Sequence, residues 1–130
     1  MRGAIEFEYD VARDVVIATP HWRIETEDDV RAWYAQYEAY FEPLGRRVDV
    51  VFVLDHFDLR PALGVLWGEY RARMQQCNTR YSIRVHPSLG VKLYVRTSGN
   101  RHGAMTDEAP DLESAYARLE ELRSRGGSGA

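Results

Sequence analysis

Val48-Asp49-Val50-Val51-Phe52-Val53-Leu54, closed by Asp55, is the most apolar strand candidate in the chain. Its β-branched residues favour an extended conformation. Apolar side chains on both faces are typical of an interior strand that is covered from both sides. We therefore expect residues 48–54 to form the middle strand of a sheet that has helices packed against it.

The residues before this strand predict a hairpin and a helix. Residues 4–9 alternate apolar and acidic side chains, and the β-branched run 15–18 follows a break at residues 10–14. This pattern predicts two strands, the first wetted on one face and the second covered on both. Thr26 and Asp29 have the spacing of a capping box, and they open a helix with one aromatic-rich face. Its apolar residues are Val30, Trp33, Tyr34, Tyr37, Phe41 and Leu44, and Pro43 and Gly45 mark its end.

The residues after the strand predict a loop, a helix and a second hairpin. Residues 56–60 form the loop, and Pro61 suits the first position of a helix. The apolar stripe of that helix is Leu63, Leu66, Trp67, Tyr70 and Met74, and Gly64 and Gly68 lie four residues apart on it. Such glycines are tolerated where a helix closely approaches a sheet or a partner. The alternating runs 81–85 and 91–97 flank turn residues 86–90 and predict the hairpin.

The end of the chain predicts a loop and a last helix. Residues 100–110 form a polar loop, and Asp111 and Ser114 open the helix. Its buried face is expected to contain Leu112, Ala115, Tyr116, Leu119 and Leu122. The element order ββαβαββα predicts an α/β (α+β) domain over residues 1–123, with a mixed sheet of about five strands and about three helices. The Gly- and Ser-rich residues 124–130 are expected to form a flexible tail.

Composition excludes several classes of partner. The 130 residues suit one domain, and the single cysteine, Cys77, cannot form an internal disulfide and suits a reducing compartment. A net charge of -3, with arginines spread along the chain, argues against nucleic-acid binding. Neither a membrane span nor a secretion signal is visible, so we expect a cytoplasmic protein.

The layout resembles the SpoIIAA-like, or STAS, domains. The resemblance is carried by residues 50–58, Val-Val-Phe-Val-Leu-Asp-His-Phe-Asp, and by Ala62-Leu63-Gly64-Val65-Leu66 at the start of the following helix. It covers about residues 5–122. Residues 55–58 and Thr79-Arg80-Tyr81-Ser82 are also similar to segments of small STAS-like domains that occur alone or appended to bacterial enzymes.

The resemblance implies a non-catalytic module that docks on proteins. In some members a serine at the start of the second helix is phosphorylated. Counting back from Leu63, the matching position here is Pro61, preceded by Arg60. Proline has no hydroxyl, so the sequence does not support that phosphorylation switch.

The first candidate site is the loop that follows the middle strand. It contains Asp55, His56, Phe57, Asp58 and Arg60, at the carboxyl end of a strand and before a helix, where ligands of open α/β sheets often bind. Arg60 and the helix amides could meet an anion or a partner. In the structural alternative, one aspartate caps the helix and Phe57 closes the core.

Aromatic and basic residues provide further interface candidates. Tyr34 and Tyr40 fall off the centre of the apolar stripe, so part of their rings could be exposed in a dimer or partner surface. In the second hairpin, Tyr94 and Arg96, with Arg84 and Lys92, could form a positive strip. The alternatives are a packed core for the tyrosines and a solvated, aggregation-resistant edge for the strip.

The sequence contains no recognisable catalytic, metal or cofactor motif. The four histidines, His21, His56, His86 and His102, lack the spacing of a helical metal site, and Cys77 has no catalytic neighbours. We therefore expect no metal or cofactor.

Three functions follow from these observations. The leading one is a STAS-like regulatory or protein-interaction module without a phosphoacceptor serine, acting on another protein or as a homo-oligomer. The alternative binds a lipid or anionic small molecule between the aromatic helix and the sheet, with its acid end near Arg60. The third is an enzyme that uses Asp55, His56 and His86 as acid–base groups.

Overall fold

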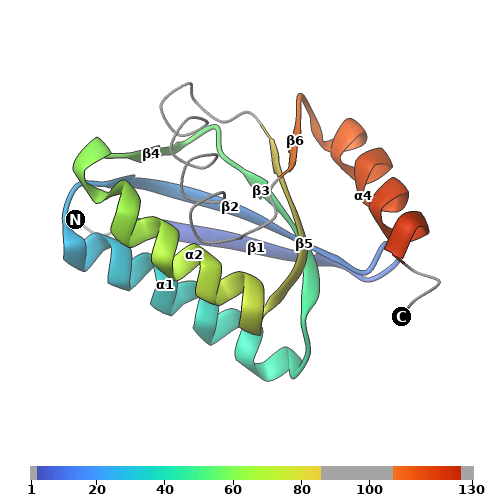
Figure 1. Ribbon diagram of the computed structural model, residues 1–130, viewed down its shortest axis with the longest axis horizontal. Coiled ribbons are helices and arrows are strands. Elements are labelled where there is room, and N and C mark those ends of the chain that lie inside the picture. The colour runs from blue at the N-terminus through green and yellow to red at the C-terminus, as the bar shows by residue number, and fades with distance from the viewer. Residues whose placement is uncertain (1–2, 86–106, 127–130) are drawn as a thin grey trace.

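The computed structural model describes residues 3–85 and 107–126, which form one mixed sheet with helices on both faces (Figure 1). In chain order the elements are β1 (Ala4–Asp10), β2 (Val15–Ile24), α1 (Glu27–Phe41), η1 (Glu42–Leu44), β3 (Val48–Val53), β4 (Phe57–Leu59), η2 (Pro61–Leu63), α2 (Gly64–Cys77), β5 (Thr79–Val85), β6 (Asp107–Ala109) and α4 (Leu112–Gly126). The predicted α/β class is confirmed.

β3 lies in the middle of the sheet, as its sequence predicts. The strand order is β1-β2-β3-β5-β6, and β4 pairs with β2. β1 is antiparallel to β2, whereas the pairs β2–β3, β3–β5, β5–β6 and β2–β4 are parallel. Every residue of β3 from Val48 to Phe52 is buried. The strand therefore organises the core on both sides of the sheet.

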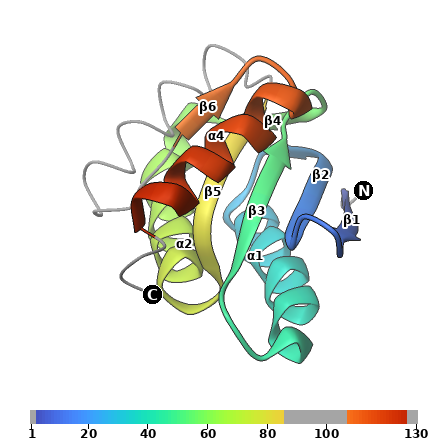
Figure 2. The ribbon, with the colours of Figure 1, turned by 90° about the vertical axis from the view of Figure 1, so that its right-hand side faces the viewer.

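The two faces of the sheet carry separate hydrophobic clusters. Val50 and Phe52 of β3 belong to the cluster under α1 and α2, and Val51 belongs to the cluster under α4. This division follows from the alternation of side chains along a strand. Figure 2 shows α4 in front of β5, with α1 and α2 behind the sheet. The cluster under α1 and α2 is the larger and contains all three tryptophans, Trp22, Trp33 and Trp67.

The capping box predicted for α1 is present. The Asp29 backbone N–H donates to Thr26 Oγ1 at 3.1 Å, and the Thr26 N–H donates to Asp29 Oδ2 at 3.0 Å. These bonds satisfy donors that a helix N-terminus leaves without partners. At the other end, Gly45 has a φ of 67°, in the left-handed region that glycine adopts without strain.

Two short strands were missed by the sequence analysis. The predicted loop at residues 56–60 contains β4, and the predicted polar loop at residues 100–110 contains β6. Each has only three residues, too few to display an alternating pattern. Each also pairs with a strand that is distant in the chain, so local sequence gives no signal for it.

The helix boundaries differ from the prediction at two places. Pro61 begins a turn of 3-10 helix rather than α2, which starts at Gly64. α4 runs to Gly126, so residues 124–126, assigned to the tail from sequence, lie in a helix. The predicted turn 86–90, the strand 91–97 and residues 127–130 lie outside the described residues.

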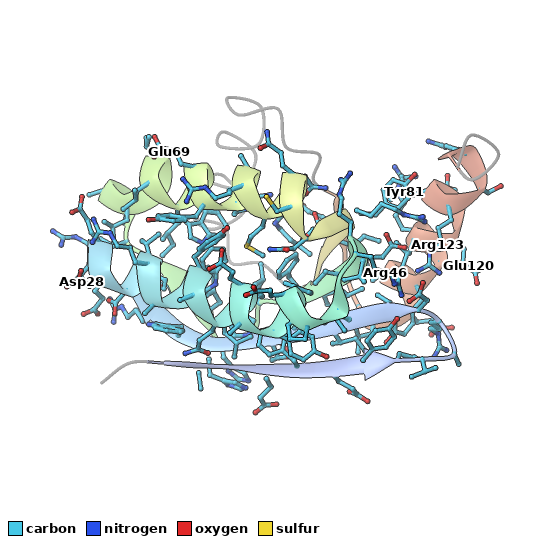
Figure 3. The ribbon with its side chains drawn as sticks, turned by 90° about the horizontal axis from the view of Figure 1, so that it is seen from below. Asp28, Arg46, Glu69, Tyr81, Glu120 and Arg123 are labelled. Carbon is cyan, nitrogen blue, oxygen red and sulfur yellow. The ribbon has the colours of Figure 1, made fainter. Side chains whose placement is uncertain are left out.

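A buried carboxylate joins α4 to the sheet. Asp49 of β3 is only 4% exposed and accepts hydrogen bonds from Arg80 Nε at 3.2 Å, the Tyr81 N–H at 3.1 Å and Arg123 Nε at 2.7 Å. Arg123 also donates to the carbonyl oxygens of Arg13 and Asp14, both at 2.8 Å. Figure 3 shows Arg123 and Tyr81 at the same end of the molecule. One arginine thus connects α4, β3 and the β1–β2 turn.

Candidate functional site

The loop predicted as a site is held against β2 at both ends. The Trp22 N–H donates to the carbonyl oxygen of His56 at 3.1 Å, and the Arg60 N–H donates to that of Ile24 at 2.9 Å. Between these two bonds, β4 lies parallel to the last residues of β2. The backbone that displays the predicted site is therefore fixed by the sheet.

The candidate side chains of this loop divide between the surface and the core. Asp55, His56, Asp58 and Arg60 are exposed. Phe57 is 4% exposed and packs with its ring centroid 5.9 Å from that of Trp67. Phe57 therefore serves the core, as the structural alternative held, and only the four polar residues can reach a partner.

Neither aspartate of the loop caps the following helix. Asp58 Oδ1 accepts the N–H of its neighbour Leu59 at 2.9 Å. Arg60 occupies the N-cap position of the 3-10 turn and makes no side-chain capping bond there. Its Nη1 instead donates to the carbonyl oxygen of Glu25 at 3.4 Å. The part of the structural alternative that assigned a cap to Asp55 or Asp58 is wrong.

Exposed apolar residues continue this surface onto the first turns of the helix. Pro61, Ala62 and Val65 are exposed, and Val65 has 49% of its surface accessible. We call the combined set the β4–α2 surface; it consists of Asp55, His56, Asp58, Arg60, Pro61, Ala62 and Val65. Figure 3 shows Glu69, one turn after Val65 on α2, at the opposite end of the molecule from Arg123. The β4–α2 surface is thus remote from the contacts that hold α4.

Two of the four histidines form a stacked pair. The rings of His21 and His56 lie 5.0 Å apart at an interplanar angle of 16°, and His21 Nε2 is 3.1 Å from Glu6 Oε1. His86 and His102 lie outside the described residues. Within residues 3–85 and 107–126, no group of three or more His, Cys, Asp or Glu side chains is arranged to hold a metal. Cys77 is exposed at the end of α2.

The tyrosines proposed as interface residues are packed against the protein itself. Tyr34 is 7% exposed, with the Tyr70 ring centroid 4.8 Å from its own. Tyr40 is half-buried and stacks on Phe7 at 4.1 Å. The expectation of free ring surface at Tyr34 is wrong because α2 and β1 extend the apolar face that α1 meets. Tyr94, Arg96 and Lys92 lie outside the described residues.

Arg84 was expected on an exposed positive strip but is buried, with 3% of its surface accessible. The reason is the place of β5, which lies between β3 and β6 rather than at an edge. Arg84 consequently faces α2. Strand order is a long-range property, and the local pattern of residues 81–85 could not supply it.

Arg84 lines a cavity of about 20 Å³ between α1, α2 and the sheet. The lining residues are Trp33, Tyr37, Phe52, Leu54, Phe57, Trp67, Arg71, Met74, Gln75, Thr79, Ser82 and Arg84. A pocket at this place was the sequence-based alternative, but its acid end was assigned to Arg60, which is not in the lining. The arginines that do line it are Arg71 and Arg84. Burial lowers the pKa of Arg71 to about 10, so its charge is held in a poorly solvated place.

Comparison with solved structures identifies the fold. SpoIIAA in its unphosphorylated form, described as an anti-sigma factor antagonist, superposes with a TM-score of 0.59 and 18% identity over 91% of this chain and 97% of that one. The Bacillus cell fate determinant SpoIIAA in the phosphorylated form gives a TM-score of 0.52 and 18% identity over 89% and 99%. The chain therefore has the SpoIIAA, or STAS, fold that the sequence resemblance predicted.

Comparison by sequence adds no relative. No family model matches the chain, and no curated protein matches it. Among the helices of the described residues, none combines the length and the apolar character needed to cross a membrane.

Proposed function

We propose that this protein is a non-catalytic regulatory module that binds another protein through the β4–α2 surface, without a phosphoacceptor at position 61. The SpoIIAA fold supports the general role, because SpoIIAA is described as an anti-sigma factor antagonist. A shared fold does not by itself assign a function. The location of the binding surface is therefore argued from this chain's own residues.

The observation that carries the proposal is the exposure of Val65 beside charged residues on a fixed backbone. Val65 is a large apolar side chain that remains 49% exposed, next to the exposed Pro61 and Ala62. Asp58 and Arg60 add charges of both signs. An apolar centre with a polar rim is the usual composition of a protein–protein interface. Because β2 holds the loop at both ends, binding would require little ordering of the backbone.

The residue at position 61 favours a binding surface that is always available and is not controlled by phosphorylation at that position. Pro61 stands where the resembled family carries its acceptor serine, counting from Leu63-Gly64-Val65-Leu66. Proline fixes φ and suits the first residue of the 3-10 turn that it opens. The residue thus stiffens the surface at the place where a serine would offer a hydroxyl.

The test is site-specific crosslinking in the native cell. A photo-crosslinking amino acid replaces Val65 in one variant and Val11 in the control. Val11 suits this use because it is 81% exposed and lies in the β1–β2 turn, at the end of the sheet near α4 (Figure 1). We expect a specific protein adduct at position 65 and none of the same mass at position 11. Equal adducts at both positions, or none at position 65, would contradict the proposal.

A further inference from the structure

β1 forms one edge of the sheet, at the margin shown in Figure 2. Among the described residues it pairs only with β2, and all seven of its residues follow one continuous register without a bulge. Natural edge strands avoid pairing with other chains by being short, by bulges, by proline, and by charged side chains, lysine above all. β6 at the opposite edge is three residues long. β1 has no proline, lysine or arginine, and only its acidic side chains belong to these devices.

The first part of this edge is already paired, by a side chain of α1. The Ile5 N–H donates to Gln36 Oε1 at 3.1 Å, and Gln36 Nε2 donates to the carbonyl oxygen of Gly3 at 3.3 Å. A carboxamide presents a donor and an acceptor side by side, as the backbone of a strand does. Gln36 therefore takes the place of an additional strand at residues 3 and 5.

The rest of the edge is open. Alternate residues of a strand in an antiparallel pair direct their N–H and C=O groups to the same neighbour. Because Ile5 faces outward, Phe7 and Tyr9 face outward as well. Within residues 3–85 and 107–126, the outward backbone groups of these two residues form no hydrogen bond. They are available to water or to another strand.

The two faces of the open edge differ in chemistry. On the face that meets α1, the half-buried rings of Phe7 and Tyr40 stack with their centroids 4.1 Å apart. On the other face Glu6 and Glu8 are exposed, since α4 packs on β3, β5 and β6. Glu6 lies 3.1 Å from His21 Nε2, and Glu8 has no ion pair among the described residues. An added strand would thus have aromatic rings beside one row of its side chains and carboxylates beside the other.

The charges argue against a second copy of this chain as the added strand. A two-fold axis through Phe7 would place Glu6 of each copy opposite Glu8 of the other. An axis midway between Phe7 and Tyr9 would place the two Glu8 side chains opposite each other. Like charges directly opposite on neighbouring strands are destabilising, whereas opposite charges are favourable. Lysine or arginine at the facing positions would complement Glu6 and Glu8.

We propose that the open edge of β1 binds an extended segment of a partner protein in which apolar side chains alternate with lysine or arginine. The backbone of the segment pairs with Phe7 and Tyr9, its apolar side chains cover the stacked rings of Phe7 and Tyr40, and its basic side chains face the glutamates. In recognition by strand addition, main-chain hydrogen bonds supply affinity and alternate side chains supply specificity. This edge is separate from the β4–α2 surface and does not depend on the proposed function.

The direct test uses a short synthetic peptide of alternating lysine and valine with the unmodified protein. Binding is followed by NMR of the backbone amides at low ionic strength, because salt screens exposed charges. We expect the largest shift changes within residues 5–10 and slower amide exchange at Phe7 and Tyr9. A peptide of alternating glutamate and valine should bind at least about 10-fold more weakly. Equal binding of the two peptides, or shift changes confined to other elements, would overturn the proposal.

Methylation of the peptide backbone separates strand addition from simple charge attraction. N-methyl groups on the valines block the β1-facing side of an antiparallel strand, and N-methyl groups on the lysines block that side of a parallel strand. We expect one of these two lysine–valine peptides to lose binding and the other to retain it. The same behaviour of both peptides would contradict strand addition.

Reversal of one charge on the protein provides the matched control. Glu8→Lys changes the open edge, and Glu69→Lys makes the same change on α2, away from β1 (Figure 3). We expect E8K to bind the lysine–valine peptide about 10-fold more weakly and E69K to bind it as the unmodified protein does. Equal weakening in both variants would overturn the proposal, and so would a dimer of the unmodified protein that the peptide dissociates in sedimentation experiments. If E8K does not fold, the methylated peptides with the unmodified protein still decide the question.

Discussion

Arg123 Nη2 of α4 lies 2.6 Å from Oδ2 of Asp49, a carboxylate that is 4% exposed on the central strand. The pair spans 74 positions in the sequence and brings the last helix to the middle of the sheet. A charge in this position requires a partner, because the desolvation of an isolated carboxylate is very unfavourable. Arg123 supplies such a partner and thereby links α4 to the central strand.

Removal of this attachment is expected to destabilise the protein. Arg123→Met leaves Asp49 with Arg80 as its remaining basic partner and removes the bonds to the Arg13 and Asp14 carbonyl oxygens. We expect a loss of about 2 kcal/mol in the free energy of unfolding, measured by urea denaturation. The control is Arg125→Met, because Arg125 makes only an exposed pair with Glu121 and should cost at most about 0.5 kcal/mol. Equal effects of the two variants would show that Asp49 does not depend on Arg123.

The capping box of α1 makes a second, smaller contribution. Thr26→Ala removes the side-chain oxygen that accepts the Asp29 N–H. We expect the free energy of unfolding to fall by about 1 kcal/mol, with the loss visible as a lower urea midpoint at unchanged m-value. Thr26→Ser keeps the hydroxyl and should recover most of the stability. If the serine variant is as unstable as the alanine variant, the lost methyl group and not the cap is responsible.

We expect the stability of the protein to depend on pH through Asp14, which lies in the β1–β2 turn. Hydrogen bonds from Arg46 and from Tyr9 lower the pKa of Asp14 below its usual value. A carboxylate whose pKa is lower in the folded state stabilises the protein above its unfolded-state pKa, and this stabilisation is lost as the pH falls through the folded-state value. Because both partners are exposed, we expect only about 0.5 kcal/mol at neutral pH.

Asp14→Asn tests this expectation with little backbone strain. Asp14 has a φ of 52°, and asparagine tolerates that region. In urea titrations from pH 6 to pH 2, the difference between the unmodified protein and D14N should be largest near pH 6 and should disappear at the acid end. A difference that does not change with pH would exclude the Asp14 carboxylate as its cause.

The sequence predicts the fold well where a feature is local or strongly periodic. The apolar composition of Val48–Val53 predicts an interior strand, and the structure places it there. The spacing of Thr26 and Asp29 likewise predicts the start of α1. β4 could not be predicted, because Phe57-Asp58-Leu59 is too short to show a period and its pairing with β2 is long-range. Asp49 is one polar residue in an apolar run, and the local sequence gives no sign of its distant partners Arg80, Tyr81 and Arg123.

The candidate sites were predicted less completely than the fold. The loop at residues 55–60 was located, and the structure assigns Phe57 to the core and the polar residues to the surface. Arg71 was not singled out, and Arg84 was placed on the surface. Their shared cavity depends on the position of β5 inside the sheet and on the rotation of α2 against it. Both are tertiary relationships that single-sequence periodicity does not encode.

Binding of the partner to purified variants tests the central proposal most directly. Once crosslinking at position 65 has identified that partner, its affinity is measured for the unmodified protein, for Val65→Asp and for the control Val11→Asp. Burying an unpaired carboxylate in an interface is unfavourable, so we predict that V65D binds at least about 10-fold more weakly while V11D binds as the unmodified protein does. Unchanged affinity of V65D, with a folded protein by circular dichroism, would contradict the assignment of the β4–α2 surface as the binding site.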